Sequence, residues 1–159
     1  MNLQQTRQLL QNSQSRFISL FEQSPQSMVL FSPSGYIRGA NQAFEELFNL
    51  AADDLIAVNF NLIEHDTIMG SGIFEHIFIG FTRKFVELPQ TVIFSGKTVR
   101  IVDNDDLWLR CCLYPVRDDQ GEVIEVVMMH RDVSSQFPPS LLNFNRELEN
   151  RVAERTRKL

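Results

Sequence analysis

The chain has 159 residues and a formal net charge of −5, with 15 Lys and Arg against 20 Asp and Glu. This length fits one domain with some appended structure. No dense basic patch is present to form a nucleic-acid groove, and the longest apolar runs are too short to span a bilayer. Cys111 and Cys112 are neighbours, so on a strand they point to opposite faces and cannot easily pair. We therefore expect a cytoplasmic domain that neither binds nucleic acid nor inserts into a membrane.

Residues 2–23 predict an amphipathic helix, because neither Gly nor Pro interrupts an apolar stripe at mostly helical spacing. Ser24-Pro25 ends this helix. An isolated amphipathic helix must lay its stripe on the sheet or on another copy of itself. The stripe consists of Leu3, Leu10, Phe17, Leu20 and Phe21.

The middle of the chain predicts two short strands, a run of short helices and a third strand. Asn41 stands where a helix cap belongs, and Ser71 can cap a later helix. Pro89 makes the third strand an edge strand or a bulged one. The expected elements are strands at 28–31 and 36–39 around a turn at 32–35, a short helix after Asn41, helical turns within 51–63, a helix from 71 to about 83, and a strand over 85–94.

Residues 107–132 predict two long strands joined by a polar turn at 118–121 that ends in Gly121. Both strands are apolar on both faces, whereas a strand with one wet face would alternate apolar with polar residues. Each face of this hairpin must therefore be covered.

Strands at both ends of the chain, with helices between them, predict an α+β fold with an antiparallel sheet and helices on one face. The segments MVLFSPSGYIRGAN, NQAFEELF, LWLRCCLYPVRDDQGEVIEVV and HRDVS resemble the PAS family, and the resemblance covers about residues 16–135. It implies a five-stranded antiparallel sheet that cups a cavity against its helices, usually as a sensor or dimerisation module. We expect a flanking helix at 1–24, a PAS domain at 25–135, and a linker with a C-terminal signalling helix at 136–159.

In the PAS pattern one face of the hairpin lines the cavity, and the helix from Ser71 forms its lid. His130 falls at an inward position, where it either contacts a ligand or is satisfied by neighbouring backbone. A small apolar ligand is the candidate occupant. The candidate pocket residues are Phe31, Phe74, Ile77, Phe78, Phe81, Leu109, Cys111, Leu113, Val126, Met128 and His130.

The other face of the hairpin carries Trp108, Arg110, Cys112 and Tyr114 with Val127 and Met129. Two covers are open: ordinary packing within the chain, for which the N-terminal helix is a candidate, or a second subunit. The candidate dimer contacts are Leu10, Phe17, Phe21, Trp108, Tyr114, Leu141, Leu148 and Val152.

Haem and flavin are disfavoured as cofactors. His76 lies about 140° from the middle of the lid stripe, so it is expected to be exposed and not to face the cavity. The reactive Asn-Cys-Arg motif of flavin-binding relatives is missing, since the matching region reads HDTIMGSG. Neither metal spacing nor a catalytic set of residues occurs, and the acidic run 103–106 and the pair His65-Asp66 predict solvated loops. We expect no metal site and no enzymatic activity.

The C-terminal segment has a seam with 4-3-4-3-4 spacing, and it resembles the signalling helix that joins PAS domains to histidine kinases. Diguanylate cyclases and other outputs use similar connectors, and a merely solvated helix is also compatible with so short a seam. The seam consists of Leu141, Asn145, Leu148, Val152, Arg155 and Leu159.

Together these features predict a sensory PAS module that acts as a parallel homodimer. Asp132 and Ser134 would pass a shift of the hairpin into the C-terminal helix and on to an output domain of the same polypeptide, a histidine kinase by the resemblance. The alternatives are a ligand-free dimerisation and relay module with its core filled by Phe and Met, and the input domain of a diguanylate cyclase.

Overall fold

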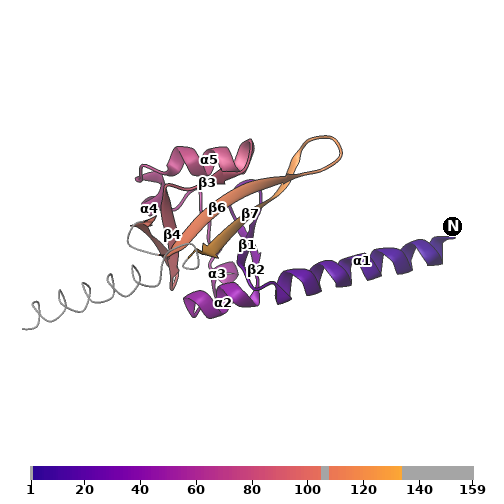
Figure 1. Ribbon diagram of the computed structural model, residues 1–159. Coiled ribbons are helices and arrows are strands. Elements are labelled where there is room, and N and C mark those ends of the chain that lie inside the picture. The colour runs from indigo at the N-terminus through magenta and orange to yellow at the C-terminus, as the bar shows by residue number, and fades with distance from the viewer. Residues whose placement is uncertain (1, 105–107, 134–159) are drawn as a thin grey trace, which may run out of the picture.

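The computed structural model describes residues 2–104 and 108–133, which form five helices and seven strands. Figure 1 shows a central sheet with short helices packed beside it and one long helix leading away. The predicted tail helix at 136–159, with Leu141, Leu148 and Val152, lies outside the described residues, as does Ser134.

The sheet has five antiparallel strands in the spatial order β2-β1-β7-β6-β3, which confirms the predicted PAS sheet. The hairpin of β6 and β7 forms its longest pair, and Leu113 stands opposite Met128. The strands are β1 (Ser27–Phe31), β2 (Ile37–Ala40), β3 (Val86–Glu87), β6 (Leu109–Arg117) and β7 (Val123–Asp132).

Asn41 caps helix α2 (Gln42–Phe48) as predicted, and it also holds the start of the domain together. Its Oδ1 accepts from the backbone N–H groups of Phe44 and Met28 at 3.1 and 3.0 Å. Its Nδ2 donates to the backbone carbonyl oxygens of Phe21 and Gln26. This fully buried amide thus ties the end of α1 to β1 and α2.

Three further helices follow, namely α3 (Ala52–Ala57), α4 (Asp66–Met69) and α5 (Phe74–Thr82). The prediction that Ser71 caps the last of these was wrong, because its hydroxyl donates to the Ile68 carbonyl oxygen and instead closes α4. Arg117 joins the far end of α5 to the hairpin, since its guanidinium donates to the carbonyl oxygens of Thr82, Arg83 and Gly121.

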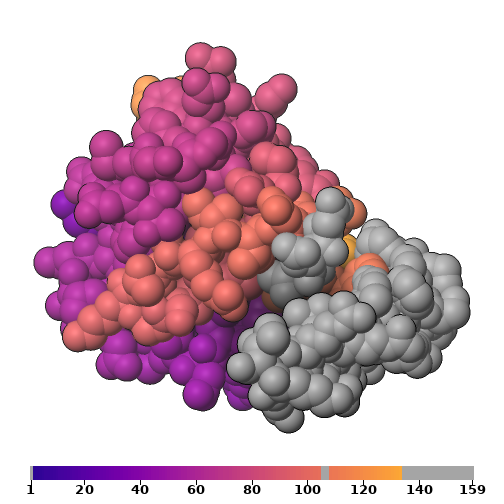
Figure 2. Space-filling view, turned by 90° about the vertical axis from the view of Figure 1, so that its left-hand side faces the viewer, coloured from indigo at the N-terminus to yellow at the C-terminus, as the bar shows by residue number. Residues whose placement is uncertain are grey.

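The single strand predicted over 85–94 is in fact two strands, and a further strand follows. β3 ends before Leu88-Pro89, where proline cannot continue a ladder, and β4 (Gln90–Ser95) pairs with β5 (Thr98–Asp103) in a separate hairpin. Its two-residue loop begins with Gly96 at a φ of 61°. In Figure 2 this hairpin, in salmon, runs across the face between the purple early helices and the pink later ones.

The core lies between the inner face of the sheet and the layer made by the helices and β4. Alternate residues of the hairpin enter it, and the side chains of Cys111, Leu113, Val126 and Met128 are fully buried. This confirms the predicted sidedness of the hairpin.

Helix α1 (Leu3–Gln23) starts with a capping box of Asn2 and Gln5 and extends away from the domain. None of its residues is buried. This helix was one of two candidate covers for the outer face of the sheet, and only its C-terminal end lies beside that face, because the rest of the helix extends beyond the sheet (Figure 1).

Candidate functional site

His130 lies on the inner face near the end of β7, opposite Ser27 of β1 and Cys111 of β6. Its ring is 2% exposed, and Nε2 donates to the backbone carbonyl oxygen of Val92 in β4. Burial lowers the pKa of His130 to about 4, and the bond to Val92 opposes that shift. The alternative that neighbouring backbone satisfies His130 is thus confirmed for Nε2, while Nδ1 is buried with no hydrogen-bond partner among the described residues.

Aromatic rings from α2 and β4 surround this histidine. The Phe48 ring lies edge-on to it with the centroids 4.8 Å apart, and Phe94 lies at 6.2 Å. Phe94 in turn packs against Phe44 and Phe60, with centroid distances of 5.1 and 5.6 Å. Such edge-to-face pairs stabilise a packed cluster beyond the area they bury. This aromatic cluster fills the space between α2 and the sheet.

The structure brings most of the predicted pocket residues together on the inner face. Leu109 and Phe74 are half-buried at its margins. The Phe31 and Phe81 rings lie 5.8 Å apart, so the sheet and α5 are in direct contact there. The residues buried in this layer are Phe31, Ile77, Phe81, Cys111, Leu113, Val126, Met128 and His130.

Phe78 was wrongly placed in the pocket, since its side chain is 47% exposed. Helix α5 is apolar nearly all round, so periodicity alone does not choose its inner face. Gly80 decides the rotation: a Cβ there would lie 2.6 Å from the Cβ of Leu113. The helix approaches the sheet most closely at this glycine, so Ile77 points inward and Phe78 points outward. His76, which was predicted to be exposed, is half-buried.

Strand β4 lies mostly within the strand predicted over 85–94, but its contribution to the inner layer was not predicted. Val92 and Phe94 are buried there, and Val92 supplies the carbonyl that holds His130. The signal was the pair Gly96-Lys97 between two runs of β-branched and aromatic residues, which is typical of a two-residue hairpin loop.

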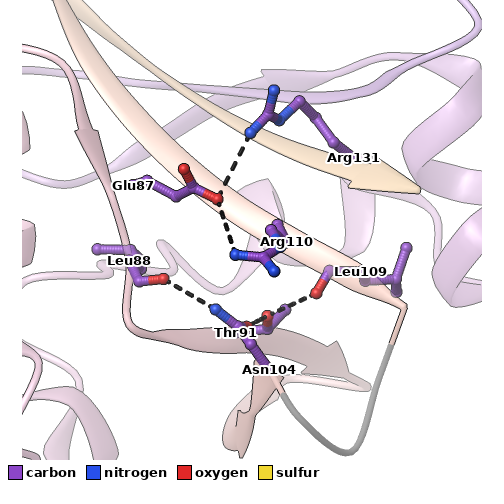
Figure 3. Close-up of polar contacts among 7 residues, drawn as sticks. All are labelled: Glu87, Leu88, Thr91, Asn104, Leu109, Arg110 and Arg131. Atoms are coloured by element: carbon purple, nitrogen blue, oxygen red, sulfur yellow. Dashed lines mark hydrogen bonds and ion pairs between the residues drawn. The ribbon is translucent and has the colours of Figure 1, made fainter. Parts of the chain in front are cut away.

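A polar cluster fastens the open end of this β4–β5 hairpin to the sheet (Figure 3). The Asn104 amide donates to the Leu88 carbonyl oxygen at 3.1 Å. The buried Thr91 hydroxyl lies within hydrogen-bond distance of two acceptors, Asn104 Oδ1 and the Leu109 carbonyl oxygen, the latter at 3.1 Å. Because a hydroxyl has one proton, it donates to one of them at a time. The predicted solvated turn at 103–106 was therefore wrong for Asn104, while residues 105 and 106 lie outside the described part of the chain.

The outer face of the sheet carries a groove of about 360 Å³ beside the last turn of α1. Its lining is apolar apart from Ser24 and Glu125. Burial raises the pKa of the half-buried Tyr114 in its wall. The lining residues are Phe17, Leu20, Phe21, Ser24, Met28, Leu30, Tyr114, Val116, Glu125 and Val127.

The predicted dimer contacts fall into two groups in the structure. On α1, Leu10 and Phe17 are 59% and 56% exposed, and Phe21 is half-buried. On the sheet, Trp108 and Tyr114 are half-buried. Phe17, Phe21 and Tyr114 meet at the outer groove, whereas Leu10 lies farther out along the helix.

The outer face becomes charged toward β3, so it is not apolar throughout as the sequence suggested. Glu87 lies 3.5 Å from both Arg110 and Arg131, measured between the carboxylate oxygen and the guanidinium nitrogens (Figure 3). All three side chains are more than a third exposed, so these ion pairs add little stability.

The two strand ends of the β6–β7 hairpin are joined where the chain leaves the sheet. The backbone N–H of Val133 donates to the Trp108 carbonyl oxygen at 2.8 Å, just beyond the pairing of Leu109 with Asp132. Asp132 is exposed at the end of β7.

Both cysteines are free, buried and on opposite faces, as predicted. Burial raises the pKa of Cys111 and of Cys112, so neither thiol is activated as a nucleophile. Across residues 2–104 and 108–133, no group of three or more His, Cys, Asp or Glu side chains is placed to hold a metal ion. No helix in the same ranges is long and apolar enough to cross a bilayer.

Comparison with known proteins shows which family has this architecture. The PAS fold family matches residues 21–136. The fold is similar to the PAS domain of Bordetella pertussis BvgS, with a TM-score of 0.51, 14% identity, and coverage of 87% of this chain and 98% of that one. It is similar to a domain of a sensory box sensor histidine kinase/response regulator from Geobacter sulfurreducens, with a TM-score of 0.51, 11% identity, and coverage of 77% and 96%. It is also similar to the PAS domain of the fruit-fly ELK potassium channel, with a TM-score of 0.54, 12% identity, and coverage of 76% and 96%.

At these identities the similar structures show the fold alone. A search of curated proteins found no match. The family match covers most of the chain and coincides with the sheet, the helices and the hairpin described above. This chain belongs to the PAS fold family.

Proposed function

We propose that this chain is the sensory and dimerisation module of a signalling protein, without catalysis of its own. It forms a parallel homodimer and relays a change in the packing of the β6–β7 hairpin through Asp132 and the C-terminal helix to an output domain of the same polypeptide. The setting is the cytoplasm.

The observation that carries this proposal is the apolar surface left open on α1 and on the outer face of the sheet. Leu10 and Phe17 are more than half exposed, and the groove beside Tyr114 is lined mainly by apolar side chains. Monomeric proteins seldom expose contiguous apolar surface of this kind. A second copy that presents the same helix and groove covers both surfaces at once, as a twofold interface requires.

For the output we propose a histidine kinase, and the Geobacter sulfurreducens similarity supports this choice, since that domain comes from a sensor histidine kinase/response regulator. The fruit-fly similarity shows that the same fold also serves a potassium channel. A diguanylate cyclase is the alternative output.

A second candidate, a ligand-free relay, is favoured by the inner face. The aromatic cluster and β4 occupy the layer in which the sequence predicted an apolar ligand. In this form of the proposal a partner or a change at the domain margin shifts the hairpin. Native mass spectrometry of the purified chain distinguishes the two, because a co-purified apolar ligand supports the sensor and a ligand-free mass supports the relay.

The dimer is tested with the double variant Leu10→Glu/Phe17→Glu, which places charge on the exposed stripe of α1. We expect the chain to change from a dimer to a monomer in analytical ultracentrifugation, because buried unpaired carboxylates oppose association. The matched control is Gln8→Glu/Ser15→Glu, which has the same spacing of seven residues and lies about 160° round the helix. A wild-type monomer, or equal effects of the two variants, would contradict the proposal.

The relay is tested by placing residues 1–159 in front of a histidine kinase core, in place of that kinase's own PAS module. We expect autophosphorylation that depends on the α1 stripe, and so is lost in Leu10→Glu/Phe17→Glu and kept in Gln8→Glu/Ser15→Glu. Autophosphorylation that is unchanged in both double variants would rule out this relay.

A further inference from the structure

A small cleft of about 250 Å³ lies between helix α3 and the loop that joins β4 to β5. Its wall includes the apolar side chains of Leu50, Leu55 and Val58. Leu55 is buried, Leu50 is half-buried and Val58 is 43% exposed, so the wall runs from the core out to the solvent. The lining comes from α3, its two ends and the loop, and the cleft is therefore separate from the outer groove beside α1.

Two opposite charges stand at this cleft. Asp54 of α3 and Lys97 of the loop both line it, and both residues are exposed. Within residues 2–104 and 108–133, neither side chain forms an ion pair or a hydrogen bond. An apolar cleft with one such anion and one such cation is complementary to a ligand that carries both charges and an apolar part.

The loop adds hydrogen-bond donors for an anionic group. Gly96 and Lys97 lie between the last paired residues, Ser95 and Thr98, so their backbone N–H groups take no part in the ladder. Across the described part of the chain, no other group accepts a hydrogen bond from either N–H. Nothing lies within 4 Å of the place where a Cβ on Gly96 would stand, so a ligand can approach the loop backbone. The loop thus offers a carboxylate both backbone N–H groups and an ammonium group.

We infer that this cleft binds a free α-amino acid with an aliphatic side chain. The ligand's ammonium group pairs with Asp54, and its carboxylate pairs with Lys97, whose flexible stem lets the charge follow the ligand. The aliphatic side chain lies along Leu50, Leu55 and Val58. The cleft is smaller than the roughly 300–1,000 Å³ of pockets for drug-sized ligands, which suits a ligand of this size. A simple cation or anion would use one charged group and be repelled by the other.

This inference goes beyond the proposed dimer and relay. A ligand in the cleft contacts both α3 and the β4–β5 loop, and Val92 of the same hairpin accepts the hydrogen bond from the buried His130. Because a ligand that binds only the folded state stabilises it, an occupant would hold this hairpin in the inner layer.

The test titrates L-leucine and three fragments of it into the whole chain. The fragments are 3-methylbutylamine, which lacks the carboxylate, 4-methylpentanoate, which lacks the ammonium group, and glycine, which lacks the side chain. We expect saturable amide shifts at residues 54–58 and 96–97 in ¹H–¹⁵N spectra with L-leucine, and affinities roughly fivefold weaker or more for each fragment. Absence of saturable shifts with L-leucine, shifts centred elsewhere, or equal affinity for any fragment would overturn the inference.

Two substitutions of exposed residues identify the charged groups. Asp54→Asn and Lys97→Gln should each weaken the binding of L-leucine roughly fivefold. The matched controls, Asp53→Asn and Arg100→Gln, remove exposed charges of α3 and β5 outside the cleft and should leave the affinity unchanged. Unchanged affinity in the first pair, or equal losses in both pairs, would contradict the inference.

Discussion

The two faces of the β6–β7 hairpin have similar compositions and different surroundings. On the inner face, Leu113 and Met128 stand opposite each other and are fully buried beneath α5 and the aromatic cluster. On the outer face, Cys112 and Val127 are buried, but Tyr114 is half-buried in the wall of an open groove and Met129 is also half-buried. An apolar run therefore predicts that a strand face needs a cover, but it does not say whether the cover belongs to the same chain.

The largest expected change in the free energy of unfolding comes from a substitution on the inner face. Leu113→Ala should lower the free energy of unfolding by about 3–4 kcal/mol, because it leaves a cavity beneath Gly80 and α5. The matched outer variant, Tyr114→Ala, should cost about 1 kcal/mol, because that side chain is only partly buried. Urea denaturation at several protein concentrations separates folding from association. Equal losses would show that the two faces are equally packed.

The stability that the inner face contributes should depend on pH, because His130 is buried there. Its pKa falls from 6.5 in the unfolded chain to about 4 in the fold, so between these values the unfolded state binds more protons. Stability should therefore decrease as the pH falls from 6.5 to 4, by at most roughly 3 kcal/mol, and this contribution should then level off.

His130→Gln is the control for that pH dependence, because it keeps an N–H donor for the Val92 carbonyl and does not titrate. The pH profile of unfolding, measured by urea denaturation, should be flatter in the variant than in the wild type over this window. Parallel profiles would mean that His130 is not the group responsible.

The smallest expected effect concerns the charged end of the outer face. Glu87→Gln should change the free energy of unfolding by about 0.5 kcal/mol or less, since its pairs with Arg110 and Arg131 are exposed. The difference from wild type should shrink further at 1 M salt. A loss above about 2 kcal/mol would show that this end is covered in solution.

The sheet, the sidedness of the hairpin and the cap at Asn41 could be predicted from the sequence, because each has a local signal in residue spacing or turn chemistry. The prediction failed at Phe78, because α5 is apolar on nearly all sides and its rotation is set by the contact of Gly80 with Leu113, which is distant in sequence. It missed the β4–β5 hairpin although Gly96-Lys97 marks the loop.

The adjacent thiols of Cys111 and Cys112 have a practical consequence. Because one faces the core and the other faces away from it, and because burial keeps both protonated, neither should react with an alkylating reagent until its own side of the sheet opens. Alkylation followed by fragmentation mass spectrometry, which assigns the label to Cys111 or to Cys112, would then follow the exposure of each side separately. A foreign cysteine introduced on α1 could be labelled alone.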